Sequence, residues 1–170
     1  MPLGRLPVNT LEEAQTVIGK IKNYILNPPE DENFYHSAAH IAHYEGTDTT
    51  EYHPNIYDSE ICRNNTMKIL PDINVIRLYQ AGDFTNPKFC GYHESQAYEL
   101  PEELKRPNYS WDTTKDDIAQ ELNKGCFYTL YRGHGGPTSF ECPNLTCEDI
   151  RNGIFINRDK LPVFFNFTCL

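Results

Sequence analysis

The sequence has no apolar run near the roughly 20 residues that a membrane-spanning helix needs, so no span is predicted. It also has no cluster of basic residues, since 15 lysines and arginines stand against 24 aspartates and glutamates, giving a net charge of −9. This balance excludes the electrostatic footprint of a nucleic-acid-binding protein. The opening residues 1–5 lack the apolar segment of a signal peptide. There is no P-loop and no dinucleotide glycine fingerprint, so no nucleotide site is predicted.

Cysteine is sparse for a disulfide scaffold, because six cysteines are scattered over the whole chain. Cys142 and Cys147 have four residues between them, but no second pair of cysteines or histidines lies close by to complete a zinc site. His36, His40 and His43 would share one face of a helix. The segment fits a strand better, however, and there His43 points to the opposite side from the other two. The residues therefore predict no metal and no cofactor.

What is present is an alternation of helical and strand patterns in a chain of 170 residues, long enough for one domain with a hydrophobic core. Thr10 and Glu13 form a capping-box pattern before an amphipathic helix that runs to about Leu26. The order of elements favours a three-layer α/β fold with a mostly parallel central sheet. The expected elements that follow are a strand at 34–42, a polar loop at 44–57, a helix at 59–70, a strand at 73–79, a helix at 113–123 capped by Asp112, a strand at 126–130, a short helix at 146–152 and a strand at 161–165.

Two features concern the organisation of the domain. The segment 81–110 is rich in proline, glycine, asparagine and tyrosine without clear periodicity, which indicates an irregular insertion. The chain starts at a helix without a preceding strand and stops at a strand without a following helix, although a parallel sheet needs both faces covered. We therefore expect residues 1–170 to be the central part of a larger domain, incomplete at both ends.

Two apolar runs each lead to a reactive side chain. Residues 126–130 precede His134, which lies among three glycines, and residues 161–165 precede Cys169. Ligands of open α/β sheets bind beyond the carboxyl ends of the strands, where a thiol and an imidazole would form a nucleophile and its base. The backbone N–H groups of Gly135 and Cys169 are then the natural donors to an oxyanion. The alternatives are a turn histidine at a strand end and a cysteine that packs as a small hydrophobic residue.

The motif Arg-Gly-His-Gly-Gly around His134, with a later apolar strand ending in Asn-Phe-Thr-Cys, resembles the gingipain family of cysteine peptidases. Residues 4–8 with the helix after them, and residues 41–46, are similar to further segments of that family. The resemblance implies a caspase-like fold, with His134 as the base and then the acid, and Cys169 as the nucleophile. It also implies that Glu45 orients the imidazole, for which the alternative is a solvated loop carboxylate.

In arginine-cleaving members an aspartate at the start of the next helix fills the primary specificity pocket. Asp58 is the nearest match, with Glu60 close by in the sequence. If Asp58 has this role, a basic residue is preferred before the cleaved bond, because a buried carboxylate favours a cation. The residues before the nucleophile, Phe167 and Thr168, depart from the small residues usual in the family, and this affects substrate preference more than chemistry.

The resemblance thus implies a cysteine endopeptidase that acts on proteins or peptides and is secreted or at the cell surface. Some members bind calcium, although no Asp-rich loop here predicts such a site. Two other functions are compatible with the residues: a catalytically silent caspase-fold module for binding or assembly, and a self-processing peptidase that cleaves its own precursor. Since covering helices would be missing, we expect the isolated 170-residue chain to be poorly stable and inactive.

Overall fold

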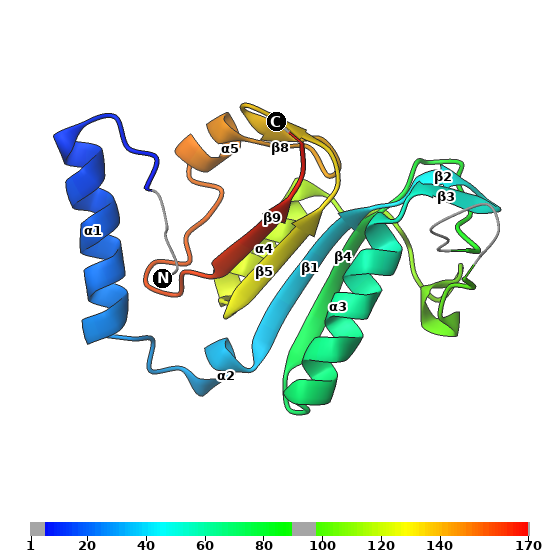
Figure 1. Ribbon diagram of the computed structural model, residues 1–170, viewed down its shortest axis with the longest axis horizontal. Coiled ribbons are helices and arrows are strands. Elements are labelled where there is room, and N and C mark those ends of the chain that lie inside the picture. Colours follow the sequence, from blue (N-terminus) through cyan, green and yellow to red (C-terminus); the bar gives the residue numbers. More distant parts are fainter. Residues whose placement is uncertain (1–5, 90–97, 170) are drawn as a thin grey trace, which may run out of the picture. The chain divides into compact units, whose positions relative to one another are not determined.

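The computed structural model describes residues 6–89 and 98–169 (Figure 1). The chain divides into two compact units, Met1–Glu32 and Asn33–Leu170. Within the described ranges, no helix combines the length and the apolar character needed to cross a membrane.

The first unit contains helix α1, Leu11–Leu26. The Thr10 side chain accepts a hydrogen bond from the Glu13 N–H at 3.1 Å, and the Glu13 carboxylate accepts one from the Thr10 N–H at 3.3 Å. These reciprocal bonds satisfy N–H groups that the first turn of a helix leaves unpaired. The helix predicted here, and its capping box, are confirmed.

The second unit is built on a four-stranded parallel sheet in the order β4-β1-β5-β9. Its central strand β1 has five consecutive buried residues, as expected for a strand covered on both faces. In Figure 1, β1 lies between β4 and β5, and β9 forms the edge beside β5. The strands are β1 (Ser37–His43), β4 (Asn74–Gln80), β5 (Tyr128–Arg132) and β9 (Val163–Phe167).

Helices cover both faces of this sheet. On one face Ala39 and Ile41 of β1 pack with Ile118 of helix α4, Lys115–Lys124. On the other face Ala42 packs with Ile56 of helix α3, Asn55–Ile69. Because successive side chains of a strand point to opposite faces, the two helices lie on opposite sides of β1. The predicted three-layer α/β fold with a parallel sheet is confirmed.

Several boundaries differ from the sequence prediction. The strand expected from residue 34 begins at Ser37, because Glu32–Tyr35 forms a short helix, α2. The expected polar loop at 44–57 contains an antiparallel hairpin. The cap of α4 is Thr114 rather than Asp112, since Thr114 forms a capping box with Asp117 while Asp112 makes a β-bridge to Gln80. The remaining elements are β2 (Glu45–Thr47), β3 (Thr50–His53), η1 (Glu102–Leu104), β6 (Gly135–Gly136), β7 (Ser139–Phe140), β8 (Leu145–Thr146) and α5 (Cys147–Arg151).

The described parts of the segment 81–110 pack into the hydrophobic core rather than extending from it. Leu100 and Leu104 are buried against Trp111, whose indole N–H donates to the Leu104 carbonyl at 2.7 Å. Residues 90–97 of the expected insertion lie outside the described residues. Apart from the 3-10 turn η1 and an isolated β-bridge between Phe89 and Glu99, the described part of the segment is irregular in backbone but ordered by aromatic packing.

The early start of α3, at Asn55 instead of residue 59, follows from a buried carboxyl group. The Glu51 Oε1 atom accepts the backbone N–H of Ile56 at 2.9 Å, and the side chain is almost fully buried. Its carboxyl group replaces the side-chain cap that Pro54 cannot supply. Burial raises the pKa of Glu51 to about 8, although hydrogen bonds from the backbone N–H groups of Ile56, Tyr57 and Asn55 act in the opposite direction.

The raised pKa of Glu51 makes stability depend on pH in a defined direction. A group whose folded pKa lies above its unfolded value, here about 8 against 4.5, contributes stability that is complete below pH 4.5 and is lost as pH rises to 8. We expect Glu51→Gln to keep the acceptor for Ile56. The variant should also show a smaller fall in the free energy of unfolding with rising pH, by on the order of 1 kcal/mol per pH unit. Urea unfolding of the full-length protein at pH 5.5 and pH 8 measures the slope. Glu30→Gln, an exposed control, should keep the wild-type slope; an unchanged slope in Glu51→Gln would contradict the assignment.

Candidate active site

His134 lies just beyond the end of β5, in a turn whose backbone is held by two hydrogen bonds to the His134 carbonyl oxygen. Its carbonyl oxygen accepts a hydrogen bond from the Tyr131 hydroxyl at 2.5 Å and another from the Glu141 N–H at 3.0 Å. Tyr131 is fully buried and stacks on Phe140, with ring centroids 3.9 Å apart. The packed ring therefore fixes the backbone from which the His134 side chain projects.

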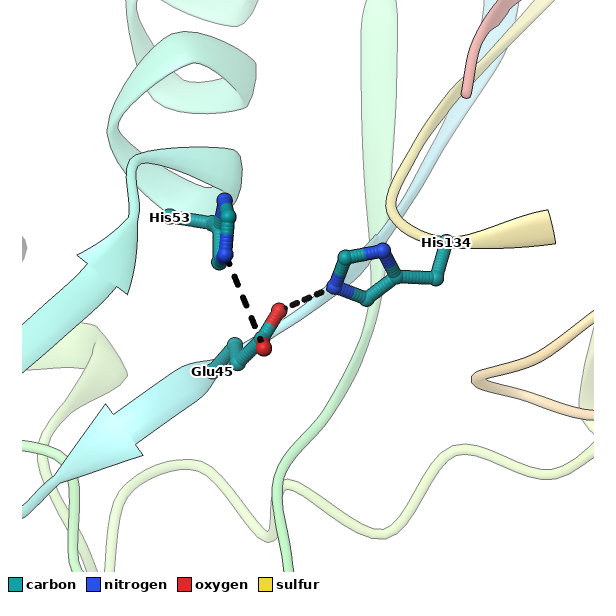
Figure 2. A group of neighbouring side chains, drawn as sticks. All are labelled: Glu45, His53 and His134. Atoms are coloured by element: carbon teal, nitrogen blue, oxygen red, sulfur yellow. Dashed lines mark hydrogen bonds and ion pairs between the residues drawn. The ribbon is translucent and has the colours of Figure 1, made fainter. Parts of the chain in front are cut away.

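Glu45 lies beside His134 at the same edge of the sheet. The hairpin β2/β3 begins just after β1, and β1 pairs with β5 so that Ala42 is the partner of Arg132. This register brings the Glu45 Oε2 atom into contact with the Nε2 atom of His134 (Figure 2). The structure thus joins the two residues for which the family resemblance implies an orienting contact.

Cys169 is placed by the ladder between β5 and β9, in which Arg132 is the partner of Phe167. His134 and Cys169 each lie two residues beyond this pair, so both follow the same rung of the sheet. A Cβ atom on Gly135 would lie 2.8 Å from Thr168 Oγ1, which shows how closely the two strand ends approach there. Gly135 and Cys169, the expected oxyanion donors, therefore both belong to this edge. Cys169 is exposed, and no hydrogen bond joins it to His134 in the described part of the chain.

The contact with Glu45 also distinguishes the two ring nitrogens of His134. Glu45 lies at Nε2, and Figure 2 shows Nδ1 on the other side of the ring. A carboxylate at one nitrogen favours the proton there, which leaves the other nitrogen as an acceptor. Nδ1 is therefore the nitrogen available to take a proton from a thiol.

Asp58 lies in the first turn of α3 and already has a cationic partner. The Arg132 Nε–H donates to the Asp58 Oδ2 atom at 3.2 Å, and a second guanidinium nitrogen lies 3.5 Å from the carbonyl oxygen of Phe167. These residues border a pocket of about 430 Å³ between α3 and the ends of β5 and β9. Glu60, the other carboxylate considered from the sequence, instead pairs with Arg77 at 2.7 Å in the interior.

The histidines considered as zinc ligands from the sequence have different surroundings. His40 is buried, with its ring 3.1 Å from the Ser59 carbonyl and 3.0 Å from the Tyr128 hydroxyl. Burial lowers the pKa of His40 to about 4. Burial also lowers the pKa of His43, against the opposing effect of Glu45. His36 is exposed outside the strand.

One residue of the site was missed from the sequence. His53 of β3 is the ladder partner of Glu45, and its Nε2 atom lies 3.7 Å from Glu45 Oε1. The ring centroids of His53 and His134 are 5.2 Å apart. Glu51 and His53 alternate with Tyr52, a strand-like pattern that could have indicated this hairpin, but its polar composition is equally typical of a loop.

A parallel α/β sheet whose neighbouring strands lead to a histidine and a cysteine just beyond their ends has the fold of the caspase-like cysteine peptidases. The chain belongs to peptidase family C25, the gingipain family, whose model matches residues 1–170. This confirms the resemblance derived from the motifs around His134 and Cys169.

A solved structure supports the same fold. The chain is similar to one in the complex of Porphyromonas gingivalis RgpB pro- and mature domains, with 18% sequence identity and a TM-score of 0.65. The match covers 95% of this chain and 31% of that chain, so the 170 residues span less than a third of the length of the RgpB chain. A search of curated proteins gives no match.

Proposed function

We propose that the protein is a cysteine endopeptidase that hydrolyses peptide bonds through Cys169 and His134. The observation that supports this most directly is the contact between Glu45 and His134 Nε2, which leaves Nδ1 as the acceptor at the edge that also holds Cys169. Membership of family C25 supports the same reaction class. The protein or peptide substrate would lie across the carboxyl ends of β5 and β9.

In the proposed reaction the Cys169 thiol gives its proton to His134 Nδ1 and the thiolate attacks the carbonyl carbon of the substrate. The oxygen of the tetrahedral intermediate accepts hydrogen bonds from the N–H groups of Gly135 and Cys169. His134 then gives the proton to the leaving amine, and a thioester on Cys169 remains. Water attacks this thioester with His134 again as the base, which releases the acid product and restores the thiol.

Covalent labelling by an electrophilic peptidyl ketone tests this proposal, because a thiolate activated by a histidine displaces the leaving group of such a probe. The probe forms a carbon–sulfur bond, so mass spectrometry of the labelled peptide identifies the cysteine directly. The measurement does not depend on knowing the natural substrate.

For substrate preference, we propose that Asp58 favours arginine or lysine before the cleaved bond. The support is its place in the pocket beside Phe167, two residues before Cys169. The preference for a basic residue should be weak, because the Arg132 guanidinium already neutralises the Asp58 carboxylate. The side chain of Asp58 is also 41% exposed. An exposed ion pair contributes little, so a substrate cation gains little more.

We therefore expect a modest preference, with kcat/KM for a peptide with arginine roughly five- to tenfold above that for the matched glutamine peptide. Asp58→Asn should reduce this ratio to about one while leaving the glutamine peptide cleaved. Asp83→Asn, an exposed aspartate outside the pocket, is the matched control. Equal cleavage of both peptides by the wild-type protein would show that Asp58 does not determine specificity.

A further inference from the structure

The contacts of Glu45 reach beyond the pair with His134. Its two carboxylate oxygens are directed to two different imidazoles, Oε2 to His134 and Oε1 to His53 (Figure 2). One ligand atom from each of Glu45, His53 and His134 can be chosen so that all three lie within 4.8 Å of one another. Among the residues that the structure describes, this trio has the donors and the proximity of a metal site.

The spacing of His53 and Glu45 is close to that of ligands in a zinc centre, whereas His134 and Glu45 are in direct hydrogen-bond contact and must separate to admit the ion. Zinc bonds of about 2.0–2.2 Å to nitrogen and oxygen, arranged as a tetrahedron, place ligand atoms roughly 3.4 Å apart. The His53 Nε2 atom lies 3.7 Å from Glu45 Oε1, so little movement is needed to reach this value. The side chain of His53 is 55% exposed on its hairpin and can make that adjustment.

The supporting elements hold the backbones of the three ligands in place. Glu45 and His53 are partners in the β2/β3 ladder, which keeps them side by side. The backbone of His134 is held by Tyr131 and Glu141. Two neutral imidazoles and one carboxylate give the trio a charge of −1, which suits a divalent cation.

The ligand types distinguish between cations. Calcium and magnesium take oxygen ligands, whereas zinc is bound well by imidazole together with carboxylate. Two histidines and a glutamate form a three-ligand zinc set that leaves one position for water. We propose that Glu45, His53 and His134 bind a zinc ion, which holds the base of the active site out of reaction.

The consequence for catalysis follows from the chemistry of imidazole and rests on the proposed peptidase function. A zinc ion on Nε2 takes the lone pair there, so the single proton of the neutral ring resides on Nδ1. Nδ1 then has no lone pair with which to accept the proton of Cys169. Zinc binding would thus switch the dyad off without contacting the nucleophile, whereas the metal site itself stands independently of catalysis.

Titration of the full-length protein with Co²⁺, a spectroscopic substitute for zinc, tests the site without any activity assay. We expect visible absorption bands of a four-coordinate ion, displaced by one equivalent of Zn²⁺. His53→Gln removes a direct ligand and should weaken binding at least about a hundredfold, since even outer partners of metal ligands contribute ten- to a hundredfold. His36→Gln, which changes an exposed histidine outside the site, is the matched control.

Cys169→Ala decides between this site and simple capture of zinc by the nucleophile. Binding of Co²⁺ that persists in Cys169→Ala and fails in His53→Gln supports the proposal. Binding that is lost in Cys169→Ala, or unchanged in His53→Gln, overturns it.

The effect on chemistry is measured separately, as the rate at which the ketone probe labels Cys169. Zinc should slow labelling of the wild-type protein, and a far higher zinc concentration should be needed to slow labelling of His53→Gln to the same degree. The rate of each protein with zinc is compared with the rate of the same protein under chelator. Labelling of the wild-type protein that zinc at saturating concentration does not slow overturns the switch. Absence of labelling under chelator would instead refute the peptidase function, while Co²⁺ binding would still decide the metal site.

Discussion

Replacing Cys169 with alanine is expected to abolish labelling by the ketone probe and to lower peptide hydrolysis more than about a thousandfold. The reason is that, in the proposed mechanism, the thiolate of Cys169 forms the covalent bond in both events. His134→Ala should have a comparable effect, because the thiol then lacks the base placed two residues beyond the same rung of the sheet. Mass spectrometry for labelling and fluorogenic peptides for turnover measure the two effects in the full-length protein.

The control for this experiment is Cys147→Ala, which removes a free cysteine at the start of α5 and should leave labelling of Cys169 intact. A folded protein that is not labelled would favour the silent binding or assembly module. Labelling at a cysteine other than Cys169 would show that the dyad is wrongly assigned. Cleavage of the protein's own precursor without turnover of added peptides would favour a self-processing peptidase.

Glu45→Gln is expected to lower kcat by about a hundred- to ten-thousandfold with little change in KM. Glutamine is nearly the same shape, but its amide has no charge to stabilise the imidazolium that forms when His134 accepts the proton. In the proposed mechanism Glu45 acts through His134 and not on the substrate, so binding of substrate should hardly change. We thus propose Glu45 as a positioning residue, and the division between kcat and KM distinguishes this role from general loss of structure.

Steady-state kinetics under chelator, which removes any effect of bound metal, provide the measurement. Glu45→Asp retains the charge on a shorter side chain and should recover part of the lost rate. Glu148→Gln changes an exposed glutamate of α5 and serves as the control. A loss that appears mainly in KM, or no loss at all, would leave Glu45 as a solvated loop carboxylate.

The parts of the fold that the sequence predicted well have strong local signals. Helix α1 has a capping box and apolar residues at helical spacing, and its predicted bounds match the observed ones. The apolar runs before His134 and Cys169 correspond to β5 and β9, each shifted by two residues toward the reactive side chain. Short apolar runs mark the existence of a strand better than its ends.

The parts that were missed depend on contacts between distant residues. The hairpin β2/β3 consists mostly of polar residues, so its composition is that of a loop, and its pairing is visible only in the structure. The start of α3 depends on Glu51, a carboxylate from outside the helix. The pair between Arg132 and Asp58 joins residues 74 positions apart, a contact that no local pattern indicates. Glu45 and Asp58 were found only through the family resemblance.

The shared rung of β5 and β9 has a mechanical consequence. Because His134 and Cys169 each follow an adjacent strand by two residues beyond the same paired rung, bending or twisting of the sheet moves both together and hardly alters their separation. A slip of β9 by one residue would instead move each of its side chains to the opposite face of the sheet. The geometry of the pair is therefore tolerant of gradual deformation and intolerant of a change in register, so loss of alignment in this domain should be abrupt rather than graded.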